Sequence, residues 1–139
     1  MRWILLLVIV IAAAGCSGQA AKQTPADLVA AFKAAGLVAD NPREMAPTDY
    51  GIAPALCKGA RFEIAPMPGV RAGLETKRYA MAFVCDNAQD QARLKDAYDN
   101  FGKVAGMLAM YTYTKGPLMV VVDGQAGKDV ADRYGAALP

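Results

Sequence analysis

The sequence predicts an α+β fold, a two-layer domain in which an antiparallel sheet of about four strands carries helices on one face. Three segments repeat apolar residues at helical spacing, and two pairs of strand-like segments lie between them, in the order α-β-β-α-β-β-α. The two members of each strand pair are adjacent in the sequence, as in hairpins, which disfavours a parallel doubly wound sheet. We assign residues 24–139 to this one domain, because the chain has room for a single core.

The first helix is predicted over residues 25–36. Thr24 is a typical N-cap followed by a proline at the first helical position, and Gly36 is a typical helix end. The Asn41-Pro42 dipeptide then breaks any regular pattern through Pro47, so this stretch is predicted to be irregular.

The first strand pair is predicted over residues 61–65 and 77–85, with a polar loop between them. Aligning Phe62 with Met81 in an antiparallel hairpin puts the large apolar side chains on one face.

Asp86 and Asn87 are predicted to cap a second helix, which has one apolar stripe. A strand over residues 107–114 follows, and Lys115-Gly116 is predicted to be a tight turn into a wholly apolar strand at 118–122. A strand without polar alternation is buried on both faces or lies centrally in its sheet. A last helix is predicted over residues 128–138.

The head of the chain is predicted to be a secretory signal peptide, residues 1–15. Arg2 supplies a positive start, and residues 4–14 are an apolar run. This run is too short for a membrane-spanning helix, which needs roughly 20 apolar residues.

The segment Ala13-Ala14-Gly15-Cys16 resembles the lipobox of bacterial lipoproteins, although Ala13 stands where that pattern usually has a large aliphatic residue. The resemblance implies cleavage by signal peptidase II just before Cys16 and attachment of diacylglycerol to its thiol, often with a further acyl chain such as palmitate. Cleavage by the ordinary signal peptidase is the alternative.

The resemblance also implies a location. Two or three acyl chains anchor a protein stably without a polybasic patch, so we expect the protein on the extracytoplasmic side of a cell-envelope membrane. In a Gram-negative cell, Ser17 after the lipidated cysteine favours the periplasmic face of the outer membrane. Residues 16–23 are small and polar, which is typical of a tether between lipid and domain.

Cys57 and Cys85 are the two cysteines that remain if Cys16 is lipidated, and in an exported protein they are predicted to form a disulfide. Closing the loop between them removes roughly 3 to 4 kcal/mol of unfolded-state freedom in the chain-entropy model. In the Phe62/Met81 register Cys85 lies opposite Lys58, so we expect the chain to leave strand geometry before Gly59 to allow the bond.

Composition excludes several functions. The chain has no histidine and a single serine, Ser17, which excludes a Ser-His-Asp triad, a Cys-His pair and a histidine metal site. With 15 Lys and Arg against 13 Asp and Glu, the chain lacks the excess of basic residues that is typical of nucleic-acid binding. We expect no cofactor and no metal site, and the sequence identifies no ligand-binding residues.

Carboxylates are the remaining abundant group with catalytic potential. Glu44 and Asp49, with Arg43 and Tyr50 nearby, are the least poor candidates for the carboxylate pair of a small hydrolase. The acidic residues of the second helix do not match a calcium-binding loop and are interpreted as cap and surface residues; they are Asp86, Asp90, Asp96 and Asp99. Tyr111 and Tyr113 share a strand face, which is either half-buried sheet or a binding platform.

The body of the chain is similar to a family of small exported bacterial proteins of uncharacterised function, and this resemblance implies no activity. The phrases that carry it are residues 31–37, 41–43, 49–51 and 83–87, with the last strand and helix. We therefore predict a lipid-anchored envelope protein with a non-catalytic domain that binds a protein or an envelope component. The alternatives are the carboxylate hydrolase and an exclusion lipoprotein of a phage or plasmid.

Overall fold

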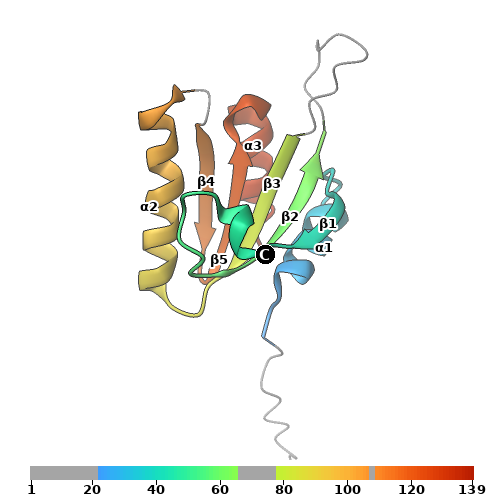
Figure 1. The fold of residues 1–139 in the computed structure, drawn as a ribbon. Helices are drawn as coiled ribbons and strands as arrows, with labels where there is room; N and C mark the ends of the chain where they lie inside the picture. Colours follow the sequence, from blue (N-terminus) through green and yellow to red (C-terminus); the bar gives the residue numbers. More distant parts are fainter. Residues whose placement is uncertain (1–21, 66–77, 107–108) are drawn as a thin grey trace, which may run out of the picture.

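The structure is a computed structural model that describes residues 22–65, 78–106 and 109–139. These residues form a five-stranded antiparallel sheet in the order β1-β2-β3-β5-β4, with helices α1, α2 and α3 packed on it (Figure 1). The helices are α1 (Pro25–Ala34), α2 (Ala88–Val104) and α3 (Lys128–Ala136), and a short 3-10 helix η1 (Pro47–Tyr50) follows the first strand. The strands are β1 (Asp40–Glu44), β2 (Lys58–Ile64), β3 (Arg78–Val84), β4 (Met110–Lys115) and β5 (Leu118–Asp123). The predicted α+β class and antiparallel sheet are confirmed, with five strands where about four were expected.

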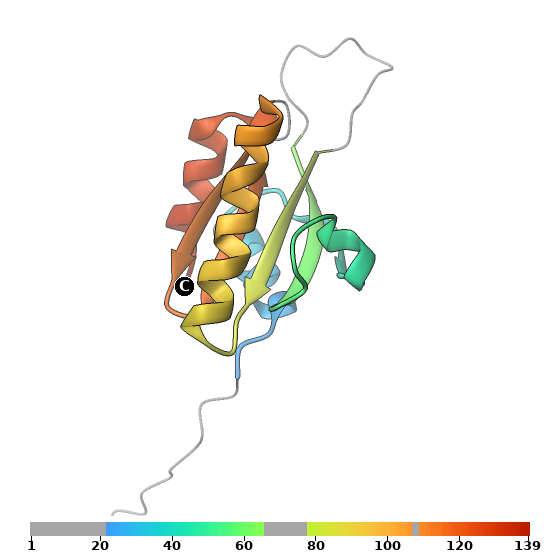
Figure 2. The same cartoon turned by 60° about the vertical axis from the view of Figure 1, so that its left-hand side comes forward.

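The helices cover both faces of the sheet, so the prediction of two layers with helices on one face is wrong. One core joins α1 and α3 to Ala80, Ala82 and the other residues of β3 and β5 that point the same way. A second core joins α2 and the segment around η1 to Met81, Phe83 and their neighbours on the opposite face. Figure 2, in which α2 comes forward, shows this helix in front of the sheet. The central strands β3 and β5 are apolar on both faces, and each face needs a cover.

Strand β1 occupies one edge of the sheet, where the sequence predicted irregular chain. All of its residues are exposed, so no apolar alternation marks it in the sequence. It pairs with β2, and the register shifts between Asp40 and Arg43, on either side of Asn41 and Pro42. Asn41 adopts a left-handed backbone with φ of 48°. A proline is tolerated here because an edge strand leaves one row of its N–H groups unpaired.

The β2–β3 hairpin is one residue out of the predicted register. Phe62 lies opposite Ala80, not Met81, and Lys58 lies opposite Val84. The pairing keeps strand geometry back to Lys58, so the expected departure before Gly59 does not occur. Continued by one residue, the observed register places Cys57 opposite Cys85.

The remaining elements follow the prediction closely. Thr24 caps α1, its Oγ1 accepting a hydrogen bond from the backbone N–H of Asp27, and Asn87 caps α2 in the same way. Strands β4 and β5 are joined by a two-residue turn in which Gly116 has φ of +54°. Within the described ranges, no helix combines the length and apolar character that a membrane crossing requires.

Candidate functional site

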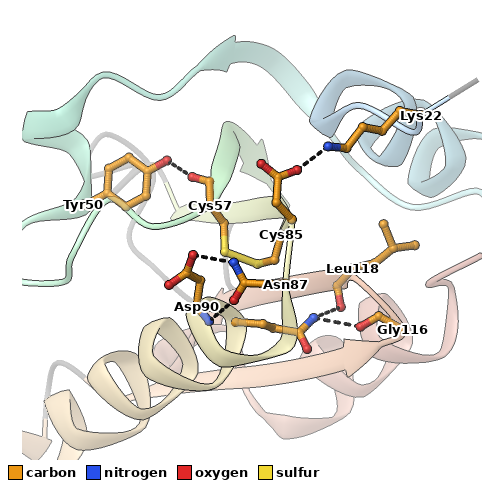
Figure 3. The surroundings of a disulfide bond; sticks show 10 residues. Lys22, Tyr50, Cys57, Cys85, Asn87, Asp90, Gly116 and Leu118 are labelled. Atoms are coloured by element: carbon orange, nitrogen blue, oxygen red, sulfur yellow. Dashed lines mark hydrogen bonds and ion pairs between the residues drawn. A yellow bond between two sulfur atoms is a disulfide. The ribbon is translucent and has the colours of Figure 1, made fainter.

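The predicted disulfide between Cys57 and Cys85 is present, with an S–S distance of 2.05 Å and a Cα–Cα distance of 4.6 Å. Both cysteines are buried in the core under α2. The Tyr50 hydroxyl donates a hydrogen bond of 2.5 Å to the carbonyl of Cys57 (Figure 3). The bond and this contact fasten the segment around η1 to the end of β3, so the disulfide is a structural element of this domain.

The chain enters the domain beside this disulfide. Lys22 forms an ion pair with Asp86, directly after Cys85 (Figure 3). Gln91 in the first turn of α2 donates hydrogen bonds to the carbonyls of Gly116 and Leu118, at 2.9 and 3.1 Å. In Figure 1 the starts of α1 and α2 and the β4–β5 turn all lie at the lower end of the molecule. The predicted lipidation site, Cys16, lies outside the described residues, as does the signal peptide.

Asp49, one of the two candidate catalytic carboxylates, is held by Arg43 and by the backbone. The two guanidinium nitrogens of Arg43 donate to its two carboxylate oxygens at 2.7 and 2.8 Å. The backbone N–H of Ala46 donates to the same carboxylate at 2.7 Å, which caps η1. The hydrogen bonds from Arg43 and then from Ala46 lower the pKa of Asp49 from 3.8 to about 2. A general acid needs the opposite shift.

Glu44, the second candidate, lies at the end of β1, apart from the pocket that Asp49 lines. It lines a cavity of about 260 Å³ beside the start of α1, together with Thr24, Lys58 and Ala60. Asp49 lines a different cavity on the other face of the sheet. The structure therefore does not bring the two carboxylates together around one cavity.

Three of the four acidic residues predicted as cap and surface residues have separate structural partners, and the fourth, Asp96, is exposed on α2. Asp86 pairs with Lys22, and Asp90 accepts a hydrogen bond of 2.7 Å from the Asn87 side chain at the helix start. Asp99 binds both Lys95 and the Thr112 hydroxyl. Across the described ranges, no three His, Cys, Asp or Glu residues lie together as a metal site would need.

Tyr111 and Tyr113 lie on the face of β4 that α3 covers. Both are half-buried and pack against the core under α1 and α3. The Tyr113 hydroxyl donates a hydrogen bond of 2.6 Å to Asp132 of α3. Burial first, and then Asp132, raise the pKa of Tyr113 well above its usual value. Of the two interpretations, half-buried sheet is the one that this arrangement supports.

A cavity that the sequence did not predict lies on the opposite face, between η1 and α2. Its volume is about 280 Å³. Four residues of β3, α2 and β4 form its apolar floor: Met81, Tyr98, Phe101 and Met110. Four residues of β2, β3, β5 and the segment around η1 form its polar rim: Asp49, Arg61, Tyr79 and Asp123. Tyr50 and Gly51 also line the cavity.

Strand register explains why these residues meet. Arg61 lies opposite Met81, and Tyr79 comes two residues before Met81 on the same face of β3. Where η1 and α2 leave the sheet uncovered, this face carries half-buried polar side chains in place of apolar ones. The one-residue error in register assigns Phe62 to the wrong face, so this grouping could not be recognised from the sequence.

The Arg61 guanidinium lies over the Tyr79 ring, with its central carbon 3.6 Å from the ring centroid. Such stacking holds the planar group in place while leaving its N–H donors available. The cavity therefore presents a positioned cation above an apolar floor.

No protein-family model, no curated protein and no solved structure matches the chain.

Proposed function

We propose that the chain is a lipid-anchored cell-envelope protein whose small domain is non-catalytic and acts by binding a protein or another envelope component. The lipobox-like segment ending at Cys16 supports the anchor. The disulfide supports export, because such bonds persist in oxidising compartments outside the cytoplasm.

The observation that carries the non-catalytic part is the state of Asp49. Its carboxylate already accepts hydrogen bonds from Arg43 and Ala46, and these bonds lower its pKa to about 2. The other candidate, Glu44, faces a different cavity. An acid–base pair of the kind that hydrolyses glycosides needs one carboxyl group with a raised pKa facing a second carboxylate. Asp49 has the opposite pKa shift, and the two candidate carboxylates do not face each other across one cavity.

The position of the entering chain supports an orientation. Lys22 lies at the disulfide end of the sheet, and six residue steps separate it from Cys16, a reach of at most about 20 Å when extended. Tyr79, Phe101 and Asp123 line the cavity between η1 and α2, and each lies toward the end of its strand or helix that is farther from the disulfide. A lipid on Cys16 would hold the disulfide end near the membrane and turn the cavity toward the aqueous side.

Mass spectrometry of the mature amino terminus tests the anchor. We expect a diacylglyceryl-modified Cys16 as the first residue, and we expect a Cys16→Ala variant to lose this mass and leave the membrane fraction. Cys57→Ala/Cys85→Ala is the matched control, because it removes cysteines but keeps the lipidation site. An unmodified terminus at any other residue would show that the lipoprotein assignment is wrong.

Co-purification from membranes tests the binding role. The intact lipidated chain, crosslinked in whole cells and isolated from membranes, should retain a specific partner that the Cys16→Ala chain retains less well. Recovery of the same proteins with both chains, or with an unrelated lipoprotein, would contradict a role that depends on the anchored domain.

A further inference from the structure

We propose that the cavity between η1 and α2 binds a small amphipathic anion, a carboxylate or phosphate group on Arg61 joined to an aromatic or apolar group on the floor. This inference rests on the proposed function, in which the domain acts by binding, and it assigns a site and a ligand class to that role.

The charge balance of the cavity selects an anion. Asp49 is neutralised by Arg43 through two hydrogen bonds. Asp123 caps the next turn through the backbone N–H of Gln125 at 2.9 Å, and its carboxylate lies 3.5 Å from Arg78. Each carboxylate of the rim thus has its own arginine, which leaves the positive charge of Arg61 as the surplus.

The donors of Arg61 are available to a ligand. Within the part of the chain that the structure describes, the Arg61 guanidinium donates no hydrogen bond and forms no ion pair, and it stacks on the Tyr79 ring. It lies close enough to Asp49 to lower the pKa of that carboxyl group, but Arg43 already occupies both carboxylate oxygens. A planar guanidinium with free, fixed donors matches the two oxygens of a carboxylate or phosphate.

The floor determines the rest of the ligand. Tyr98 and Phe101 lie edge to face with ring centroids 5.3 Å apart, and the Tyr98 hydroxyl is directed to the Met81 sulfur at 3.5 Å. These groups offer apolar and sulfur surface, with the tyrosine hydroxyl already partnered. About 280 Å³ is at the lower limit for ligand pockets and suits a group of about one ring.

Binding of paired probes to the full chain in detergent micelles tests the proposal. The anionic probes are N-acetylphenylalanine, a carboxylate, and phenyl phosphate. Their neutral counterparts are N-acetylphenylalaninamide and benzyl alcohol. Saturation-transfer NMR and amide chemical shifts give the affinities, and far-UV circular dichroism confirms that each variant is folded.

We expect at least one anionic probe to bind and its neutral counterpart to bind far more weakly. Arg61→Gln should weaken anion binding by roughly 10- to 100-fold, as for loss of hydrogen bonds to a charged group. Arg61→Lys should recover part of this loss, because it restores the charge without the planar donors. Arg93→Gln is the matched control: Arg93 is exposed on α2 and should not affect binding.

Binding by only one anionic probe would identify the head group as carboxylate or phosphate. Absence of binding by both, equal binding of the neutral counterparts, or unchanged affinity in Arg61→Gln would overturn the proposal. These outcomes are separable from failure of the proposed function. Release of phenol from phenyl phosphate would contradict a non-catalytic domain while leaving the site in place. A lipidated Cys16 with no anion binding would support the anchored protein of the proposed function and overturn the anion site.

Discussion

Removal of the disulfide is predicted to cost a large share of the stability of this domain. Cys57 and Cys85 are separated by 28 residues. In the chain-entropy model, a loop of this length lowers the unfolded-state entropy by about 12 cal/mol/K, which is about 3.6 kcal/mol at 25 °C. Domains of this size are stable by roughly 5–15 kcal/mol in total. The double variant Cys57→Ala/Cys85→Ala should therefore fold, but with a much smaller free energy of unfolding.

Urea unfolding followed by circular dichroism measures this difference. With a slope of about 1.5 kcal/mol/M, the midpoint of the double variant should fall by about 2 M. Reductant supplies the control: it should lower the midpoint of the parent chain by a similar amount and leave the double variant unchanged. A loss below about 1 kcal/mol would refute the reasoning that the bond acts by restricting the unfolded chain. An effect of reductant on the double variant would show that the shift in midpoint does not come from the loss of the disulfide.

Three further outcomes follow from the described contacts. Gly135→Ala should destabilise the domain by about 1–3 kcal/mol in thermal or urea unfolding, because the new Cβ would lie 2.4 Å from the Tyr113 ring; Gly106→Ala, with nothing within 4 Å, is the control and should cost far less. Asp49→Asn should reduce the fall in the free energy of unfolding at acid pH. The pKa of Asp49 in the folded domain, about 2, is below the ordinary 3.8, so the stabilisation present above pH 4 is lost as pH falls toward 2. A variant with the same dependence of stability on pH as the parent would contradict the ion pair. Tyr134→Phe should cost about 1–3 kcal/mol, because the hydroxyl donates a hydrogen bond of 2.5 Å to a backbone carbonyl that follows α1; equal stability of the variant and the parent would show that this bond contributes nothing.

Local sequence patterns predicted the elements whose signals are local. The cap at Thr24, the apolar stripe of α2 and the turn at Gly116 each depend on residues within a few positions of one another. The disulfide pair could be predicted without any local pattern, by counting cysteines, although the register in which it forms could not.

The register of β2 and β3 could not be derived from apolar alternation alone. Met81 and Ala80 are adjacent, both are buried, and they lie on opposite faces of a strand covered on both sides. When a strand is apolar on both faces, moving the partner by one residue exposes no apolar surface, so the pattern does not choose between registers. The cysteines do choose, because direct opposition of Cys57 and Cys85 requires the observed pairing.

The helix layers and the cavity were missed for a related reason. The wholly apolar strand β5 indicated either burial on both faces or a central place in the sheet, and nothing in its sequence says which helix lies on which side. Arg61, Tyr79 and Asp123 come from three strands, so their meeting depends on sheet order and register together. Such a site becomes visible when both are known.

The edge strand β1 also limits how these molecules can associate. Pairing with a strand of another copy needs a row of free N–H and C=O groups at regular spacing. At this edge Pro42 has no N–H to donate, Asn41 turns the backbone into a left-handed conformation, and every side chain of the strand is exposed. Charged residues and a proline are the means by which proteins protect a sheet edge. The domain can therefore be concentrated on a surface without its sheet growing through β1 from one molecule into the next.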